Sequence, residues 1–290
     1  MRLPLVVGVD GSESSLQAVD WAADEAARSE LSLRLVHASQ WENYESASFN
    51  YDFAGATRMS VAERTVSTAA TRATLRQADL KVSTAVVPEG AESALLREAR
   101  DATALVTGSR GLSPFAELLL GSVSLAVAAR APCPVVVVRG TKASRDGVYG
   151  KVLVGVNREV TDPASVRFAL QQAKARACPL EAVTAWRTPA QDPNLLPAAA
   201  AQFTRSYEEQ AAARLDDALR AADEHPGIRV DRSTVEGPAH KVLRDLSTTA
   251  DLLVLGAHRR HNRLGLQLGP TAHALLHHAH CPVAIVPNHD

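Results

Sequence analysis

The chain has 290 residues, which is enough for two domains of ordinary size. Hydrophobic residues make up 46% of it, charged residues make up 22%, and the formal net charge is −1. This balance excludes a chain that is disordered throughout, and it argues against a nucleic-acid partner, which usually requires clustered Lys and Arg. The longest apolar runs, such as Val135–Val138, are far too short to cross a bilayer, so we expect no membrane span.

The first residues and the cysteines both indicate a cytoplasmic protein. The N-terminal apolar run ends at Asp10, before the hydrophobic region of a signal peptide could form. Cys133, Cys178 and Cys281 are an odd number of cysteines and contain no C-x-x-C pair. They predict reduced, mostly buried thiols rather than a disulfide framework or a zinc ribbon.

The chain contains an internal repeat. The segment Val6-Val-Gly8-Val-Asp10 recurs as Leu153-Val-Gly155-Val-Asn157, an offset of 155 − 8 = 147. Cys133-Pro-Val recurs at Cys281, an offset of 281 − 133 = 148, and Glu89-Gly90 recurs as Glu236-Gly237. The matches keep their order, which predicts two copies of one domain, residues 1–140 and 150–290, joined by the polar, glycine-containing stretch 140–150.

In the first copy, apolar and β-branched runs predict five strands with helical periodicity between them. The strands are expected at residues 3–9, 33–37, 82–87, 104–106 and 135–138. Ser12 is a suitable N-cap for a first helix. The apolar faces of the first two helices are expected to contain Leu16, Val19, Ala22 and Ala26, and Ala62, Val66, Ala69 and Ala73.

The second copy repeats this order. Its strands are expected at residues 152–156, 180–185, 228–235, 252–255 and 283–286, and its first helix at Asp162-Pro163, with Asp162 as the N-cap. Strands alternating with helices predict an α/β fold of two tandem doubly wound domains, each a five-stranded parallel sheet flanked by helices. The irregular stretches 41–57 and 187–201 are expected to be either covers over the open end of a sheet or plain surface loops.

Ligands of doubly wound sheets bind at the carboxyl ends of the strands, where the strand order reverses, so the loops after the first and fourth strands are candidates. The first loop contains Gly8 and Asp10. The second reads Gly108-Ser109-Arg110-Gly111, then nine residues, then Gly121-Ser122-Val123-Ser124 at the start of an apolar helix. Glycines allow a close approach of the backbone and a helix N-terminus offers N–H donors, so this loop suits a phosphate.

The spacing G-x2-G-x9-G-S from Gly108 to Ser122, the segment around Asp10 and the Cys-Pro-Val triplet resemble the universal stress protein family, and the resemblance covers both copies. It implies an adenine-nucleotide α-hydrolase-like fold that binds an adenine nucleotide. ATP, with or without Mg²⁺, is the expected ligand, and AMP or a cyclic nucleotide is the alternative that the sequence leaves open. It also implies that domains pair through their last strands, as an intramolecular domain pair or in a homodimer.

The resemblance further implies roles for residues of the first copy. Asp10 would lie beside the adenosine, and the backbone near Ala38 would meet the adenine edge. The residues expected to line the ribose and phosphates are Gly108, Ser109, Arg110 and Gly111. Those expected to hold phosphate oxygens are Gly121, Ser122, Val123 and Ser124.

The second copy keeps the spacing of this site but loses part of its chemistry. Gly155, Gly256 and Gly269 match Gly8, Gly108 and Gly121, whereas Asn157 stands in place of Asp10, Arg259 of the second glycine and Pro270 of the serine. Pro270 has no N–H to donate, and Arg259 carries a long side chain where the backbone should approach a ligand. We therefore predict weak or no nucleotide binding in the second copy; the alternative is that Arg259 contacts phosphate directly.

The sequence gives less support to a metal site or to an enzyme active site. Histidines crowd the end of the second copy, and His273 and His277 share a helix face, but a metal site lacks a third ligand at a clear spacing. The P-loop, dinucleotide, nucleophile-elbow and zincin motifs are absent, so we expect no enzyme, with slow ATP hydrolysis left open. The expected function is ATP-dependent regulation in a stress response or dormancy through an unknown protein partner. The alternatives are a protein-interaction module with structural or no nucleotide, and a slow ATPase.

Overall fold

The computed structural model describes residues 2–39, 52–110, 120–156, 163–188, 197–222, 227–257 and 268–288, with side chains outside 52–60 and 197–201. The chain divides into two compact units, Met1–Arg139 and Gly140–Asp290. Each unit alternates strands and helices around parallel strands, which confirms the predicted doubly wound α/β fold. Within the described ranges, every helix is too short or too polar to span a membrane.

Five parallel strands form the sheet of the N-terminal unit, in the order β3-β2-β1-β4-β5. They are β1 (Leu5–Gly8), β2 (Leu33–Ala38), β3 (Val82–Val87), β4 (Ala104–Gly108) and β5 (Val135–Val138). All five predicted strands are present. β1, β4 and β5 are apolar runs that are almost fully buried in the sheet, whereas β3, at the edge of the sheet, has exposed Ser83 and Thr84 and only Val87 buried. The strand order reverses between β1 and β4, so their carboxyl ends mark the switch point at which such sheets bind ligands.

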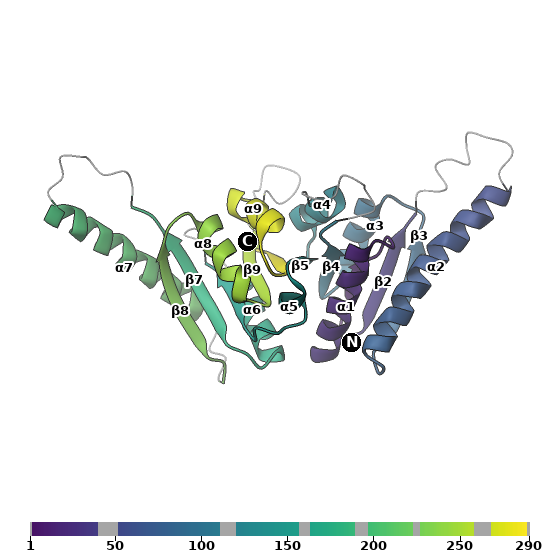
Figure 1. Cartoon of the computed structure of the whole chain (residues 1–290), viewed down its shortest axis with the longest axis horizontal. Coiled ribbons are helices and arrows are strands. Elements are labelled where there is room, and N and C mark those ends of the chain that lie inside the picture. Colours follow the sequence, from purple (N-terminus) through teal and green to yellow (C-terminus); the bar gives the residue numbers. More distant parts are fainter. Residues whose placement is uncertain are drawn as a thin grey trace. The chain divides into compact units, whose positions relative to one another are not determined.

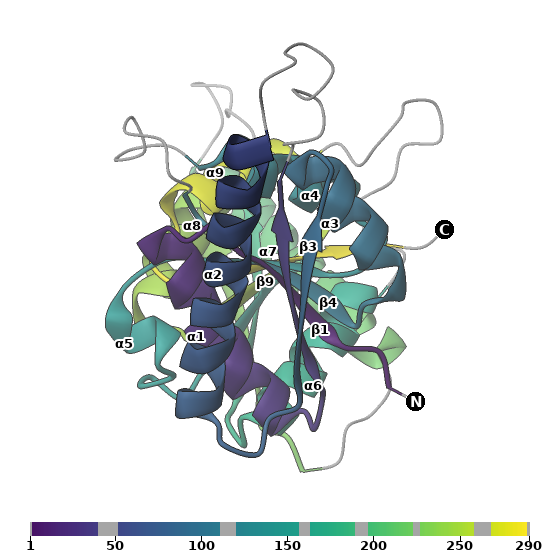
Figure 2. The ribbon, with the colours of Figure 1, turned by 90° about the vertical axis from the view of Figure 1, so that its right-hand side faces the viewer.

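Two helices cover each face of this sheet (Figure 2). On one face, α1 (Glu13–Arg28) packs against α2 (Asp52–Arg76). On the other, α3 (Ala91–Glu98), which continues into the 3-10 turn η2 (Ala99–Asp101), packs against α4 (Ser122–Arg130). The predicted N-cap is confirmed, because Ser12 Oγ accepts a hydrogen bond of 3.1 Å from the backbone N–H of Ser15.

The C-terminal unit repeats this plan, with the strand order β10-β9-β6-β7-β8. Its strands β7, β8 and β9 are labelled in Figure 1. Its strands are β6 (Val152–Gly155), β7 (Leu180–Trp186), β8 (Val230–Glu236), β9 (Leu252–Ala257) and β10 (Val283–Pro287). Its helices are α6 (Ala164–Ala175), α7 (Pro197–Ala221), α8 (Ala239–Leu246) with the turn η3 (Ser247–Thr249), and α9 (Pro270–His278). α6 packs on β6, β9 and β10, α7 packs on β7 and β8, and α8 packs against α9.

Three expectations about helix ends are corrected. α2 begins at Asp52 and α7 at Pro197, so parts of the stretches expected to be irregular are helical, while 41–51 and 189–196 lie outside the described residues. Pro163, not Asp162, is the N-cap of α6 and makes no side-chain capping bond. The expected linker contains a short helix, α5 (Lys142–Arg145), capped by Thr141.

The stretch that contains α5 is bonded to the rest of the C-terminal unit. The backbone N–H of Thr141 and the hydroxyl of Ser144 both donate to the carbonyl oxygen of His280, at 3.1 and 2.9 Å. Asp251, only 2% exposed, accepts hydrogen bonds from the backbone N–H groups of Tyr149 and Lys151, at 3.0 and 3.2 Å. Residues 141–151 are therefore an ordered part of this unit.

Candidate functional site

The carboxyl edge of the N-terminal sheet, meaning the carboxyl ends of its strands and the segments that follow them, brings together most of the predicted site residues. Gly8, Ala38 and Gly108 end β1, β2 and β4. Asp10 follows β1, Ser109 and Arg110 follow β4, and the residues from Gly121 to Ser124 form the start of α4. Gly111 lies outside the described residues.

Asp10 organises the turn between β1 and α1. Its Oδ1 accepts hydrogen bonds from the backbone N–H and the hydroxyl of Ser12, at 2.9 and 2.6 Å. Gly11 between them has φ +83°, a conformation that favours glycine. One carboxylate oxygen thus positions the cap of α1, and Oδ2 receives no hydrogen bond from the described residues, which leaves it available to a ligand hydroxyl.

Gly108 has a packing role that its spacing did not indicate. A methyl group at this position would lie 2.5 Å from Oγ and 2.6 Å from the carbonyl oxygen of Ser14 on α1. The same Oγ accepts a hydrogen bond of 3.1 Å from the backbone N–H of Arg110. Glycine at this position therefore lets the end of β4 approach the first turn of α1.

The two ends of the glycine loop are joined by hydrogen bonds. The backbone N–H of Gly121 donates to the carbonyl oxygen of Ser109 at 2.9 Å, and the backbone N–H of Ser109 donates to that of Val138 at 3.1 Å. The Ser124 hydroxyl, which is buried, donates to the carbonyl oxygen of Gly108 at 2.7 Å. Since that proton is engaged within the protein, Ser124 fixes the loop, and only its backbone N–H is left to approach a phosphate.

The start of α4 has the features of an anion site. Gly121 is its N-cap and makes no side-chain capping bond, and no acidic residue lies in the first turn. The first N–H groups of an α-helix have no carbonyl partner within the helix, and the helix dipole places partial positive charge there. Ser122 is exposed, so its hydroxyl and the N–H groups of Ser122 and Val123 can meet a ligand from solvent.

His37 also lies at this edge, although the sequence analysis did not select it. Its Nδ1 is 2.8 Å from the carbonyl oxygen of Val9, which requires Nδ1 to carry a proton and to donate it. This bond joins the carboxyl ends of β1 and β2 on the side covered by α1 and α2. The only signal in the sequence was a polar residue near the end of a buried strand.

The matching edge of the C-terminal unit is only partly described. Gly155 ends β6 against Leu243 of α8, Gly256 lies in β9, and Gly269 is the N-cap of α9. Pro270 occupies the first turn of α9, as the spacing predicted. Asn157 and Arg259 lie outside the described residues, so the direct contact of Arg259 with phosphate stays a prediction.

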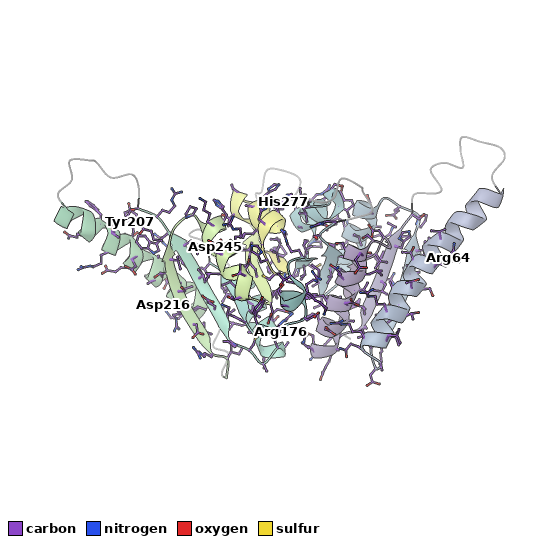
Figure 3. The ribbon with its side chains drawn as sticks, viewed as in Figure 1. Arg64, Arg176, Tyr207, Asp216, Asp245 and His277 are labelled. Atoms are coloured by element: carbon purple, nitrogen blue, oxygen red, sulfur yellow. The ribbon has the colours of Figure 1, made fainter. Side chains whose placement is uncertain are left out.

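The histidines of the C-terminal unit do not assemble a metal centre in the described part. The ring centroids of His273 and His277 on α9 are 4.7 Å apart, and His277 is labelled in Figure 3. However, the described residues contain no group of three or more His, Cys, Asp or Glu side chains that could hold a metal ion. His258 and His261 lie outside those residues.

Comparisons with known proteins all match this chain to members of one family. The model of the universal stress protein family matches residues 1–139 and 149–287. A universal stress protein from Mycobacterium tuberculosis is 30% identical over 290 residues, which cover 97% of this chain and 96% of that protein. A second one from the same organism is 26% identical over 282 residues, with coverages of 97% and 95%.

Solved structures show the same fold. A universal stress protein from Archaeoglobus fulgidus aligns over 98% of both chains with a TM-score of 0.68 at 17% identity, a likeness that concerns the fold alone. A universal stress protein solved in complex with cAMP is 32% identical, but it covers 48% of this chain and 98% of its own, with a TM-score of 0.36. Its ligand is therefore a fact about that protein only.

Proposed function

Because the chain belongs to the universal stress protein family, we propose that its N-terminal unit binds an adenine nucleotide, ATP, at the carboxyl edge of the sheet. The observation that carries the proposal is the start of α4, an uncapped helix N-terminus held beside the end of β4. Such a terminus provides several N–H donors and partial positive charge to phosphate oxygens.

The remaining groups of this edge suit the rest of a nucleotide. Oδ2 of Asp10 can accept a hydrogen bond from a ribose hydroxyl, while Oδ1 keeps the turn rigid through Ser12. The backbone beyond Ala38 can meet the edge of the adenine, as the family resemblance implies. Backbone groups and one carboxylate would do most of the recognition, and Arg110, shortly after β4, is the cationic residue expected near the phosphates.

We further propose that binding serves regulation rather than turnover. Phosphoryl transfer needs a placed base and bound cations around the phosphate. Asp10 is the carboxylate that directly follows β1, and its Oδ1 is already engaged in the turn. Slow hydrolysis is the second expectation, and phosphate release above the buffer rate would support it. The nucleotide state would then set the conformation or the assembly of the protein.

The test is the amount of nucleotide bound per chain in three proteins: the wild type, Gly121→Asp and Gly269→Asp. Asp is a good N-cap, so α4 stays folded in Gly121→Asp, but the new carboxylate occupies the donors and repels phosphate. We expect about one ATP per wild-type chain, at least tenfold weaker binding by Gly121→Asp and wild-type binding by the matched control Gly269→Asp.

Three results would contradict the proposal. Unchanged binding by Gly121→Asp would place the phosphates elsewhere. If the wild type binds two nucleotides per chain and Gly269→Asp binds one, the second copy also binds nucleotide. No bound nucleotide, together with no uptake of added ATP, would favour the protein-interaction module.

A further inference from the structure

Basic side chains gather on the exposed side of the packed helices α8 and α9, and we call this surface the histidine face. Its members, all of them exposed, are His240, Lys241, Arg244, His273, His278 and His280. Because α8 packs against α9, these side chains lie on one helical layer or, in the case of His280, just beyond its end. The sequences of the two helices contain one carboxylate, that of Asp245.

The matching helices of the N-terminal unit are joined by an ion pair that the C-terminal unit has lost. At the offset of 148 residues, α3 and α4 match α8 and α9. Glu92 on α3 pairs with Arg130 on α4. The residues that match this pair are His240 and His278, since 240 − 92 = 148 and 278 − 130 = 148. An attraction between opposite charges in the first copy is thus replaced by two imidazoles, which carry like charges once both are protonated.

The two matching surfaces also differ in net charge. Residues 91–101 and 122–132 contain three Arg and three Asp or Glu, so their formal charge is 0. Residues 239–249 and 270–280 contain one Lys, one Arg, one Asp and five His, so their formal charge is +1 with neutral histidines and +6 with all five protonated. Histidine changes its charge between about pH 8 and pH 5. The charge of the second surface therefore depends on pH, whereas that of the first does not.

Some of these histidines lie close enough together for their charges to interact. The ring centroids of His273 and His277 are 4.7 Å apart, and those of His277 and His278 are 6.0 Å apart. Two protonated rings at such distances repel each other, and an anion beside them removes that cost. Anion binding and proton uptake on this surface therefore favour each other, as linked equilibria must.

The described carboxylates on the elements packed around α8 and α9 already have cationic partners. Asp245 on α8, labelled in Figure 3, accepts hydrogen bonds from Nε and Nη2 of Arg244, at 3.0 and 2.9 Å. Glu181 is on β7, which packs against α8, and it pairs with Lys151 at 2.8 Å. A counter-charge for the protonated histidines has to come from a ligand or from salt.

We propose that the histidine face binds an acidic peptide segment of a partner protein, and that binding strengthens as the pH falls from about 8 to about 6. Carboxylates of Asp and Glu stay ionised over this range, whereas histidines become charged. α8 and α9 have eight and nine residues, so they are about 12 and 14 Å long. The face therefore matches a few successive carboxylates of an extended peptide.

Two other anionic partners fit the histidine face less well. Proteins that bind single-stranded nucleic acid stack the bases on aromatic rings, and α8 and α9 contain no Phe, Tyr or Trp. Helices that lie on a membrane insert large apolar side chains into it. The exposed large apolar residues of the described chain all lie outside α8 and α9: they are Leu3, Val61, Leu75, Val148, Tyr149 and Phe203.

The test measures the binding of a fluorescent deca-aspartate peptide to the full chain by anisotropy, at about 0.1 M salt, where charges more than about 10 Å apart are screened. We expect the dissociation constant to be about tenfold lower at pH 6 than at pH 8. In the triple variant His240→Gln/His273→Gln/His278→Gln, this ratio should fall below about threefold, because three exposed histidines no longer take up protons. The control Arg100→Gln/Arg205→Gln removes two exposed cations outside the face and should keep the wild-type ratio.

The proposal is overturned if the wild type does not bind the peptide at pH 6, or if it binds equally well at both pH values. It is also overturned if the triple variant keeps the wild-type ratio, or if an uncharged Ser-Gly peptide of the same length binds as tightly. Tighter binding of a single-stranded oligonucleotide or of phosphatidylserine vesicles than of the peptide would assign the face to a nucleic acid or a membrane, and would overturn the choice of partner.

Discussion

At the scale of single residues, Gly108 and Gly256 occupy matching positions but differ in how tightly they are packed. A methyl group on Gly108 would meet the backbone of Ser14 at 2.6 Å, whereas one on Gly256 would meet only side-chain atoms, at 3.2 Å or more. Backbone cannot move aside as a side chain can, so we expect Gly108→Ala to lower the free energy of unfolding by about 1–3 kcal/mol and Gly256→Ala by clearly less. Urea unfolding of both variants measures this, and equal losses would contradict it.

The buried thiol of Cys133 is expected to make the free energy of unfolding depend on pH in the alkaline range. Cys133 forms no disulfide, and burial raises the pKa of its thiol to about 11. The unfolded chain loses this proton near its ordinary pKa, whereas the folded chain retains it, so the stabilisation is complete below about pH 8.5 and is lost as the pH rises towards 11. Between pH 8.5 and 10.5, the free energy of unfolding should fall by about 2 kcal/mol less in Cys133→Ala than in the wild type.

The control for this experiment is Cys178→Ala, because Cys178 is less buried than Cys133. Urea unfolding at the two pH values gives the free energies. If Cys133→Ala shows the same loss as the wild type, the thiol of Cys133 does not contribute to the alkaline change.

The structural role of a single residue could be predicted from the sequence where that role depends only on residues nearby in the chain. Ser12 as an N-cap and Pro270 in a first helical turn were predicted because capping and proline geometry act within one turn. Two other interactions could not be predicted. The contact of Gly108 with Ser14 depends on how α1 packs on the sheet, and the hydrogen bond from His37 to Val9 depends on the register of β1 and β2.

At the scale of elements, the pair of Arg34 on β2 and Glu98 at the end of α3 ties a helix to the sheet. Nε and Nη2 of Arg34 donate to the two carboxylate oxygens of Glu98, at 2.6 and 3.1 Å. These bonds hold the pKa of Glu98 below its ordinary value, although burial opposes the shift. The stabilisation is therefore present above the unfolded pKa, about 4.3, and is lost as the pH falls through the lower folded pKa.

Replacing Arg34 by Met should accordingly lower the free energy of unfolding by about 1 kcal/mol at pH 7, since solvent still screens part of the pair. The difference from the wild type should shrink as the pH falls below about 4 and through the lowered folded pKa of Glu98, because Glu98 then becomes protonated in both forms. Arg220→Met is the control, because Arg220 pairs with Asp217 at an exposed place on α7, far along the chain from Glu98. A difference that persists unchanged at acidic pH would assign the effect to lost packing of the Arg34 side chain.

Elements were predicted best where burial and periodicity agreed. Strands such as Val82–Val87 and Val135–Val138 have the predicted bounds because they are short runs rich in β-branched residues, which favour strands. The early starts of α2 and α7 were missed because aromatic or proline-containing stretches lack an apolar period. α5 was missed because four residues are too few to show one, and its Thr141 cap carries the only local signal.

At the scale of the whole molecule, the bonds of residues 141–151 predict where the C-terminal unit begins as a folding unit. A fragment that begins at Gly150 lacks the donors from Thr141, Ser144 and Tyr149, and leaves the buried Asp251 with one fewer hydrogen bond. We expect it to be less stable than the fragment 140–290 by about 2–4 kcal/mol, from two or three such bonds at roughly 1 kcal/mol each and more for the one to Asp251.

Thermal unfolding of the two fragments measures the difference. Lys142→Ala in the longer fragment, a change at an exposed side chain, should melt with its parent. If the two fragments melt together, α5 is only a connection between the units.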